Sequence, residues 1–271
     1  MNLLPDWDFM KEFISWTIQI FGLWFAYHKL TKWRKEAIGK KKIDLAEDVL
    51  VGFQDIKNII EYARYYQTSP QELEKILEDL NDPIESVFSD NLRYLTAFYR
   101  ITKKAEVIQS WYLLKNNSRV YWGEEIGTCF DSLKKITTEI SYSSKKLYYE
   151  SKSEETADDP LLLEVCVSII ESETIDVTES DFDKIKKNQD DLCRLISNDP
   201  DFQELNPIPS DTRLKNIVSK CMKIVEYKRK IYDSSRENDE IKIKVDQILK
   251  EVEFNLEDLL KDKKIPWKYP T

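Results

Sequence analysis

The hydrophobic pattern along the chain changes once, near residue 43. Before that point, over residues 13–25, apolar side chains go all the way round the helix that the sequence predicts. Beyond it, they recur every three or four residues and leave the positions between them polar. The first pattern is typical of a helix surrounded by lipid or protein, and the second of helices that bury one face. We therefore predict an all-α protein, with an N-terminal transmembrane helix followed by an elongated cytoplasmic helical bundle.

The predicted anchor is centred on residues 13–27, a run of fifteen residues without a charged side chain. A membrane-spanning helix needs roughly 20 predominantly apolar residues, and at 1.5 Å per residue this run covers only about 22 Å. We expect Lys11 and Lys29 to make up the difference by extending toward the headgroups. Aromatic side chains suited to the membrane interfaces are Trp7, Trp16, Trp24, Tyr27 and Trp33. A buried core helix or a surface-lying helix is the alternative interpretation.

Charges on the two sides of this run predict its orientation. Three acidic residues and one lysine precede the run, a formal charge of −2, and the opposite sign follows it. Seven basic residues, set against Glu36 alone, form what we call the basic collar: Lys29, Lys32, Arg34, Lys35, Lys40, Lys41 and Lys42. The positive-inside rule then predicts a single-pass protein of the inner (cytoplasmic) membrane, with its N-terminus outside. The collar is also a candidate for binding lipid headgroups, although a stop-transfer role alone explains it. The same charge order excludes a cleaved signal peptide.

Small and polar residues line one face of the predicted anchor. They are spaced by four, three and four positions: Ser15, Gln19, Gly22 and Ala26. Such a face allows two helices to approach closely and lets Gln19 donate a hydrogen bond inside a bilayer. It is therefore a candidate for self-association of the anchor into a homo-oligomer. The ordinary frequency of these residues explains the pattern equally well.

The helix after the collar has one narrow apolar seam. Its members alternate between spacings of three and four: Ala46, Val49, Phe53, Ile56, Ile60 and Ala63. This spacing predicts a helix that ends near Tyr66 and is open to being continuous with the anchor. The seam fits a coiled coil between chains over about three heptads. The favoured interpretation is that it packs on a long helix of the same chain, over residues 83–115.

Further helices follow from capping signals and apolar stripes. Ser69, Pro70 and Glu72 form a capping box at a helix start. The same order of residue types at 82–85 predicts the start of the long helix at 83–115. Residues 116–118 are expected to end that helix. Residues 120–149 form the next helix, and we place a helical bundle at 43–150, after the anchor and collar of 1–42. An acidic loop or linker spans 151–160, and 161–271 adds helices packed on the bundle, at about 178–196, 214–231 and 241–259. Residues 161–170 fit either a helix or a strand.

Composition narrows the range of partners. The 271 residues carry a formal charge of −9, and the part after residue 42 carries −13. Nucleic-acid binding depends on clustered Lys and Arg, so we expect no nucleic-acid partner. The four cysteines lie far apart without a C-x-x-C pair, which predicts neither a disulfide framework nor a zinc site.

Catalytic motifs are missing from the sequence. The single histidine, His28, lies at the end of the predicted anchor, where an interfacial role is expected. Without a histidine in the body, Ser-His and Cys-His catalysis and histidine-dependent zinc sites are excluded. Phosphate-binding loops and nucleophile elbows are missing too, and only five glycines occur. We predict no enzyme activity, no cofactor, no metal and no catalytic residue.

The order of segments resembles a known kind of protein. An N-terminal span and basic collar are followed by LAEDVLVGFQDIKNIIEYARYY and then by FDSLKKITTEISYSSKKLYY. Over about residues 10–150 this order resembles a loose group of uncharacterised bacterial single-span membrane proteins with a cytoplasmic helical body. The resemblance implies a topology and no mechanism.

Three functions are compatible with these observations. We predict a membrane-anchored scaffold or sensor that acts by protein–protein interaction, with the lipid bilayer and a cytoplasmic protein or a second copy as partners. The first alternative is a membrane-acting effector of the toxin or defence type that oligomerises through its anchor. The second alternative is an enzyme with an unrecognised site.

Overall fold

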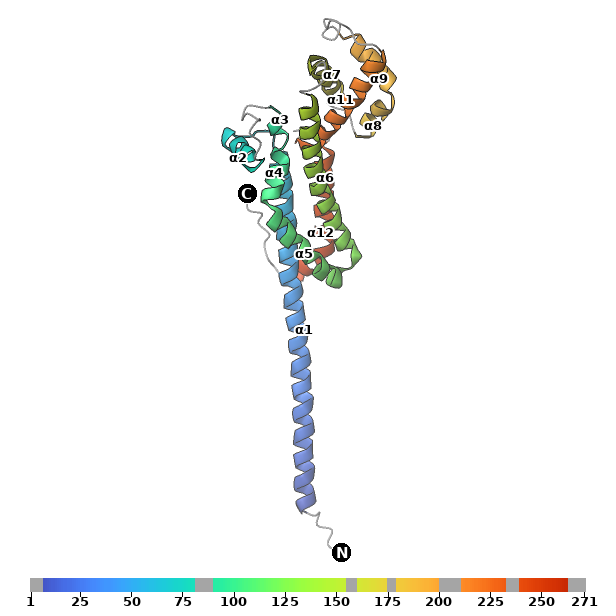
Figure 1. The fold of residues 1–271 in the computed structure, drawn as a ribbon. Helices are drawn as coiled ribbons and strands as arrows, with labels where there is room; N and C mark the ends of the chain where they lie inside the picture. Colours follow the sequence, from blue (N-terminus) through green and yellow to red (C-terminus); the bar gives the residue numbers. More distant parts are fainter. Residues whose placement is uncertain are drawn as a thin grey trace. The chain divides into compact units, whose positions relative to one another are not determined.

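The computed structural model describes residues 7–80, 90–154, 160–174, 179–199, 211–232 and 239–262. Every regular element in these ranges is a helix, so the all-α prediction is confirmed (Figure 1). The chain divides into two compact units, one made of Met1–Val49 with Leu256–Thr271 and the other of Leu50–Asn255. We describe each unit by itself.

Helix α1 runs without interruption from Trp7 to Arg64, over 58 residues. The predicted anchor and the seam helix are therefore one helix. Within the described residues, no helix combines the length and the apolar character needed to cross a membrane. The prediction of a transmembrane helix, and with it of a single-pass inner-membrane protein with its N-terminus outside, is therefore wrong. The physical reason lies in the sequence, because the charge-free run has only fifteen residues, contains the polar Gln19, and is followed directly by His28 and Lys29.

The seam of α1 is buried along its whole length, from Ala46 to Ala63. Within the second unit, the ring of Phe53 contacts the ring of Trp111 at 5.2 Å and that of Phe130 at 4.7 Å, both edge to face. The two partners belong to helices α5 (Ala105–Trp122) and α6 (Glu124–Glu154). The prediction that the seam packs on residues 83–115 of the same chain is confirmed at Trp111, and α6 shares the contact.

Helix α2 (Pro70–Leu80) begins where the capping signal predicts. The hydroxyl of Ser69 accepts a hydrogen bond from the Glu72 backbone N–H at 3.2 Å, which is the first half of the capping box. The Glu72 carboxylate, expected to complete the box, is bound by Arg100 instead. The Ser69 half of the capping box is therefore present as predicted, whereas the Glu72 side chain binds Arg100 of another helix.

The predicted long helix at 83–115 is three shorter ones: α3 (Asp90–Arg93), α4 (Thr96–Lys103) and α5. Its expected start at residues 82–85 lies outside the described residues. The hydroxyl of Ser144, on α6, donates to the Tyr94 carbonyl at 2.5 Å and accepts from the Phe98 N–H at 3.0 Å. This side chain takes the place of helical hydrogen bonds at the α3–α4 junction and so stabilises the interruption.

Helix α5 continues through residues 116–118, where a break was expected, and ends at Gly123. Gly123 has φ of +82°, a conformation that side chains disfavour, and its N–H donates to the Arg119 carbonyl at 2.9 Å. The glycine, rather than the two asparagines, sets the end of this helix.

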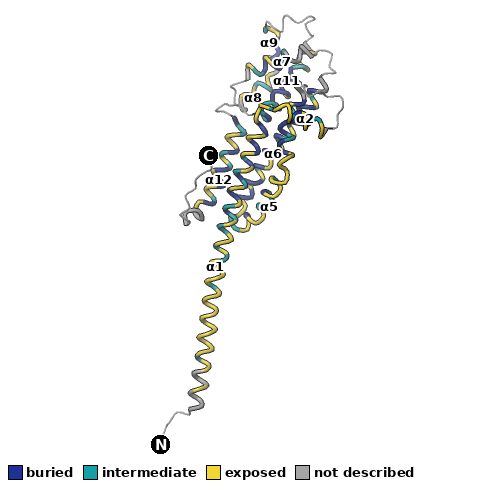
Figure 2. Tube along the Cα trace, turned by 90° about the vertical axis from the view of Figure 1, so that its left-hand side faces the viewer, coloured by how far each residue is buried: buried dark blue, intermediate teal, exposed yellow. Residues whose placement is uncertain are grey.

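The remaining helices are α7 (Pro160–Thr174), α8 (Glu179–Lys187), α9 (Gln189–Ser197), α11 (Asp211–Ile231) and α12 (Glu240–Asp262). Residues 161–170 are thus helical, and the helix expected at 178–196 is interrupted at Asn188. Helix α6 packs against α4, α5 and α11, and α11 also packs against α7 and α9. Of the predicted acidic loop, 151–154 belong to α6, and 155–159 lie outside the described residues. Figure 2 shows the buried positions concentrated in these packed helices and the first part of α1 exposed.

Candidate interaction surface

The early part of α1 carries a dense set of exposed apolar side chains. From residue 16 to residue 33 the large ones are 48% to 72% exposed: Trp16, Ile18, Ile20, Phe21, Leu23, Trp24, Phe25, Tyr27, Leu30 and Trp33. We call residues 16–33 the exposed segment. Contiguous apolar surface of this extent is uncommon on isolated proteins and usually marks a binding surface. In the described part of the second unit, by contrast, exposed apolar residues are more widely spaced, as at Leu113 and Val120 on α5.

Most of the residues assigned to membrane contact lie on this segment and just after it. The aromatic candidates Trp16, Trp24, Tyr27 and Trp33 are exposed, and Trp24 stacks on His28 with ring centroids 5.8 Å apart. The Trp7 side chain lies outside the described residues. In the basic collar, the Lys29 ammonium lies 5.5 Å from the centroid of the Phe25 ring, which places a charge beside the apolar surface. The assignment of these residues to membrane interfaces and headgroups depended on a membrane-spanning helix. No helix in the described ranges fits such a span, so the structure does not support the assignment.

The small-residue face of α1 is also exposed. Ser15, Gln19, Gly22 and Ala26 all face solvent, and no atom lies within 4 Å of the position that a Cβ on Gly22 would take. The face is therefore available for close contact. Its role in self-association stays a prediction.

Among the described residues of the second unit, two arginines are buried, and the first of these, Arg100, is 3% exposed. Its guanidinium donates two hydrogen bonds of 2.8 Å to the two carboxylate oxygens of Glu72, a paired geometry that is among the strongest in proteins. The same group donates to the backbone carbonyls of Tyr62 at 2.9 Å, Tyr65 at 2.6 Å and Gln67 at 2.8 Å. Burial by itself lowers the pKa of Arg100, but the hydrogen bond and charge of Glu72 outweigh this effect and raise it. Arg100 thus stays charged and joins α4, α2 and the last turn of α1.

The second buried arginine, Arg64, ends α1 and is likewise 3% exposed. Its Nη1 lies 2.9 Å from Oδ2 of Asp239 and donates to Oδ1 at 3.1 Å. Its other nitrogens donate to the carbonyls of Lys230 at 3.2 Å and Tyr232 at 2.8 Å, at the end of α11. Oδ1 of Asp239 also accepts from the N–H groups of Ile241 and Lys242, so this residue caps α12. One ion pair therefore joins the ends of α1 and α11 to the start of α12.

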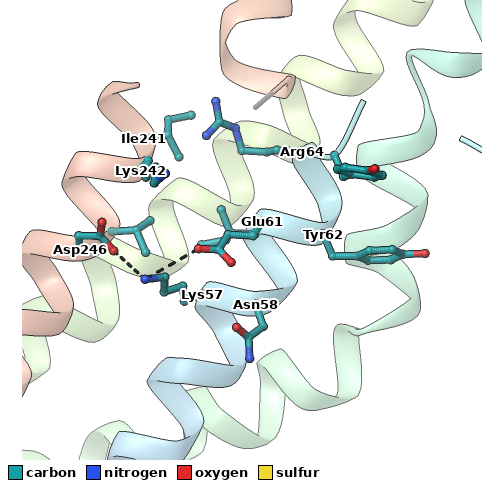
Figure 3. A pocket seen from close by; sticks show the side chains of 11 residues that line it. Lys57, Asn58, Glu61, Tyr62, Arg64, Ile241, Lys242 and Asp246 are labelled. Atoms are coloured by element: carbon teal, nitrogen blue, oxygen red, sulfur yellow. Dashed lines mark hydrogen bonds and ion pairs between the residues drawn. The ribbon is translucent and has the colours of Figure 1, made fainter. Parts of the chain in front are cut away.

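A shallow polar pocket lies beside Arg64, between the last turns of α1 and the start of α12 (Figure 3). Its volume is about 480 Å³, and the following residues line it: Lys57, Asn58, Ile60, Glu61, Tyr62, Arg64, Tyr65, Ile241, Lys242, Val245 and Asp246. Lys57 points between two carboxylates, 2.8 Å from Asp246 and 3.8 Å from Glu61. Lys57, Asp246 and Glu61 therefore neutralise one another within the pocket.

A metal site and a reactive cysteine each place requirements on the side chains that the structure describes. No group of three His, Cys, Asp or Glu side chains there is placed to hold a metal ion. All four cysteines are buried and unpaired with one another. Burial, reinforced by the nearby charge of Glu251, raises the pKa of Cys129 to about 12, so its thiol stays protonated and unreactive.

Sequence reasoning missed Arg64 and Arg100. Arg64 follows Ile60 by one helical turn, so a charged residue sits where the apolar seam should continue. Arg100 stands one turn after Thr96, on the buried side of α4. For Arg64 the available signal was therefore a charged residue on a predicted apolar face, because such a residue is rarely buried without a partner. No apolar face was predicted at Arg100.

No protein-family model, curated protein or solved structure matches this chain. The resemblance to single-span bacterial proteins therefore stays a prediction.

Proposed function

We propose that this chain is an interaction protein, a scaffold or sensor, that binds another protein through the exposed segment of α1 and performs no catalysis of its own. The observation that carries the proposal is the exposure of ten large apolar side chains within eighteen residues of one helix. Leaving such surface in water is costly, about 25 cal/mol for each Å². A partner that covers it gains that free energy on binding.

Aromatic residues make this surface well suited to protein recognition. Trp and Tyr are enriched among the residues that dominate binding energy in protein interfaces. The exposed segment contains Trp16, Trp24, Tyr27 and Trp33, each more than 60% exposed. The neighbouring basic collar supplies the charged border that surrounds apolar interface centres.

The second unit supports the same proposal through its own side chains. Its described apolar residues are largely buried, and its two buried arginines bind carboxylates and carbonyls rather than facing a cavity. The polar pocket beside Arg64 has its lysine paired with carboxylates. These contacts stabilise helix ends, which is the work of a folded support rather than of an active site.

Photo-crosslinking in cells tests the proposal. A photoreactive amino acid at Leu23, 72% exposed, should form an adduct with a protein that mass spectrometry identifies, and the identified protein should form the reciprocal adduct. The matched control is Val120, which is 80% exposed but lies outside the exposed segment, on α5, and which should form none. If position 23 forms no more protein adduct than position 120, the exposed segment is not a protein-binding surface and the proposal fails.

A further inference from the structure

Five of the exposed apolar residues form a single stripe along α1. Trp16, Ile20, Leu23, Tyr27 and Leu30 follow one another at spacings of four, three, four and three, and are 48% to 72% exposed. An average spacing of 3.5 residues keeps side chains on one side of a helix and is the pattern by which two helices pair. We call these five residues the exposed stripe. The seam from Ala46 to Ala63 has the same spacing but is already buried.

The exposed stripe is the longest apolar stripe on this part of α1. Within residues 16–33, the opposite side carries Ile18, Phe21 and Phe25 and then continues through Lys29 and Lys32. A partner helix on the opposite side would therefore meet ammonium groups one turn after Phe25. On the stripe side, apolar contact extends over four turns.

The area fits a pair of helices. Taking about 200 Å² for a fully exposed large side chain, the stripe together with the flanking Trp24 and Trp33 presents on the order of 900 Å² in one copy. A stable interface of standard size buries about 800 Å² on each partner. A second copy of the stripe thus supplies as much apolar surface as a specific dimer needs.

The basic collar selects the relative direction of the two helices. In a parallel pair, each collar, with its formal charge of +6, would lie beside the other at the usual helix separation of about 8–10 Å. In an antiparallel pair centred on the stripe, the two Lys35 residues lie about 40 Å apart along the axis, at 1.5 Å per residue. The Debye length is about 8 Å at physiological salt, so this repulsion is screened away. Each collar then lies toward the N-terminal end of the other helix, where residues 7–12 carry a formal charge of −1.

A two-fold axis also gives four of the five residues of the stripe an apolar counterpart within the stripe of the other copy. With the axis between positions 21 and 22, Ile20 faces Leu23 and Trp16 faces Tyr27 of the other copy, and the converse holds, as a closed two-fold interface requires. The stripe lies about a quarter turn from the face formed by Ser15, Gln19, Gly22 and Ala26. Small residues favour close helix approach in lipid, where burial of apolar surface provides no driving force. In water, association through the stripe is favoured over association through the small-residue face, because the stripe removes more apolar area from water.

We propose that a second copy of this chain covers the exposed stripe of α1, with the two helices antiparallel and Trp16 of each copy facing Tyr27 of the other. This inference rests on the proposed function, because it names the partner that the exposed segment binds. It differs from the predicted self-association in its face and in its orientation.

Disulfide trapping with two differently tagged chains tests the geometry. One chain carries Trp16→Cys and the other Tyr27→Cys, and the four native cysteines are buried. A disulfide needs Cα atoms within about 7 Å. The antiparallel pair should therefore give the mixed disulfide. It should give no disulfide between two Trp16→Cys chains, whose Cα atoms lie about 16 Å apart along the axis. Disulfides between identical chains, without the mixed one, would overturn the antiparallel arrangement.

Sedimentation of the purified full chain tests the partner and the face. Native chain should have twice the 32.2 kDa mass of one copy. The variant Ile20→Glu/Leu23→Glu should sediment as a single copy. The matched control Ile18→Glu/Phe25→Glu, equally exposed on the opposite side, should remain double.

The outcomes of these experiments separate the two proposals. A monomeric native chain overturns the second-copy inference, and an adduct with a different protein at position 23 then leaves the proposed function standing. A monomeric chain that floats with phosphatidylglycerol vesicles and forms no protein adduct overturns both in favour of a lipid surface. If the native chain and both double variants all sediment as dimers, the interface lies elsewhere and the inference is overturned.

Discussion

Replacing Arg100 with methionine should destabilise the fold more than any exposed substitution. Methionine keeps the length and packing of the aliphatic stem but removes all five N–H donors. The Glu72 carboxylate, whose side chain is 15% exposed, then loses its paired cation. The carbonyls of Tyr62, Tyr65 and Gln67 lose a donor at the same time.

The expected cost follows from the burial of this ion pair. Removing one member of a buried pair costs about 3–5 kcal/mol, because the remaining charge is left without compensation. Tyr62 and Tyr65 are themselves about half exposed, so water can reach part of the freed carbonyls. We therefore expect the lower end of the range, about 3 kcal/mol. Arg100→Lys keeps the charge but loses the paired geometry, and should fall between the native chain and Arg100→Met.

Urea unfolding followed by far-ultraviolet circular dichroism measures these free energies. Arg194→Met is the matched control, since the Arg194 and Asp191 side chains are 80% and 64% exposed and lie 3.8 Å apart, and an exposed pair contributes about 0–1 kcal/mol. Combining Arg100→Met with Glu72→Gln should cost less than the two single changes added together, because each removes the same interaction. A loss below about 1 kcal/mol for Arg100→Met, or strict additivity with Glu72→Gln, would refute the structural role of this pair.

Two further predictions follow from packing and charge. Gly52→Ala should cost about 1–3 kcal/mol, because its Cβ would lie 2.6 Å from Cδ1 of the buried Trp111 ring. Gly39→Ala on the same helix, with no atom within 4 Å, should be neutral or stabilising by up to about 1 kcal/mol. Equal costs in urea unfolding would show that the ring moves aside. Burial raises the pKa of Glu226. Hydrogen bonds and charges from Lys186 and Lys230 together lower this pKa by more than burial raises it, so the net shift is downward from 4.5. Its contribution to stability is then present above pH 4.5 and lost as the pH falls through the lowered value. Native chain should therefore lose more stability than Glu226→Gln between pH 7 and pH 3, and equal losses in urea midpoints would contradict this.

Local signals in the sequence predicted the helices well where those signals decide the structure. The alternation of threes and fours from Ala46 to Ala63 predicted a buried seam, and Ser69 predicted the start of α2. Both depend on residues within a few turns of one another. The interruption between α3 and α4 was missed because its cause, the Ser144 hydroxyl, lies about 50 residues further along the chain.

The membrane prediction failed for a different reason. All-round apolarity was given more weight than length, although the charge-free run covers only about 22 Å at 1.5 Å per residue. The same residues remain exposed and apolar in the structure. Sequence reasoning thus identified residues that are exposed and apolar in the structure but assigned them to a membrane span that the structure does not support, because hydropathy reports how costly exposure is but not what relieves it.

The two buried arginines show which part of a helical fold apolar patterns leave undetermined. A helix leaves its last four carbonyl groups without partners inside the helix, and no periodicity says where donors will come from. In the second unit, Arg100 of α4 supplies them to the carbonyls that end α1, and Arg64 supplies them to the end of α11 while pairing with the cap of α12. Apolar stripes therefore determine which helix faces pack together. The two arginines stabilise the ends of the packed helices by binding their terminal carbonyl groups. Since each arginine serves groups from two other elements, its role becomes visible only when the tertiary structure brings those elements together.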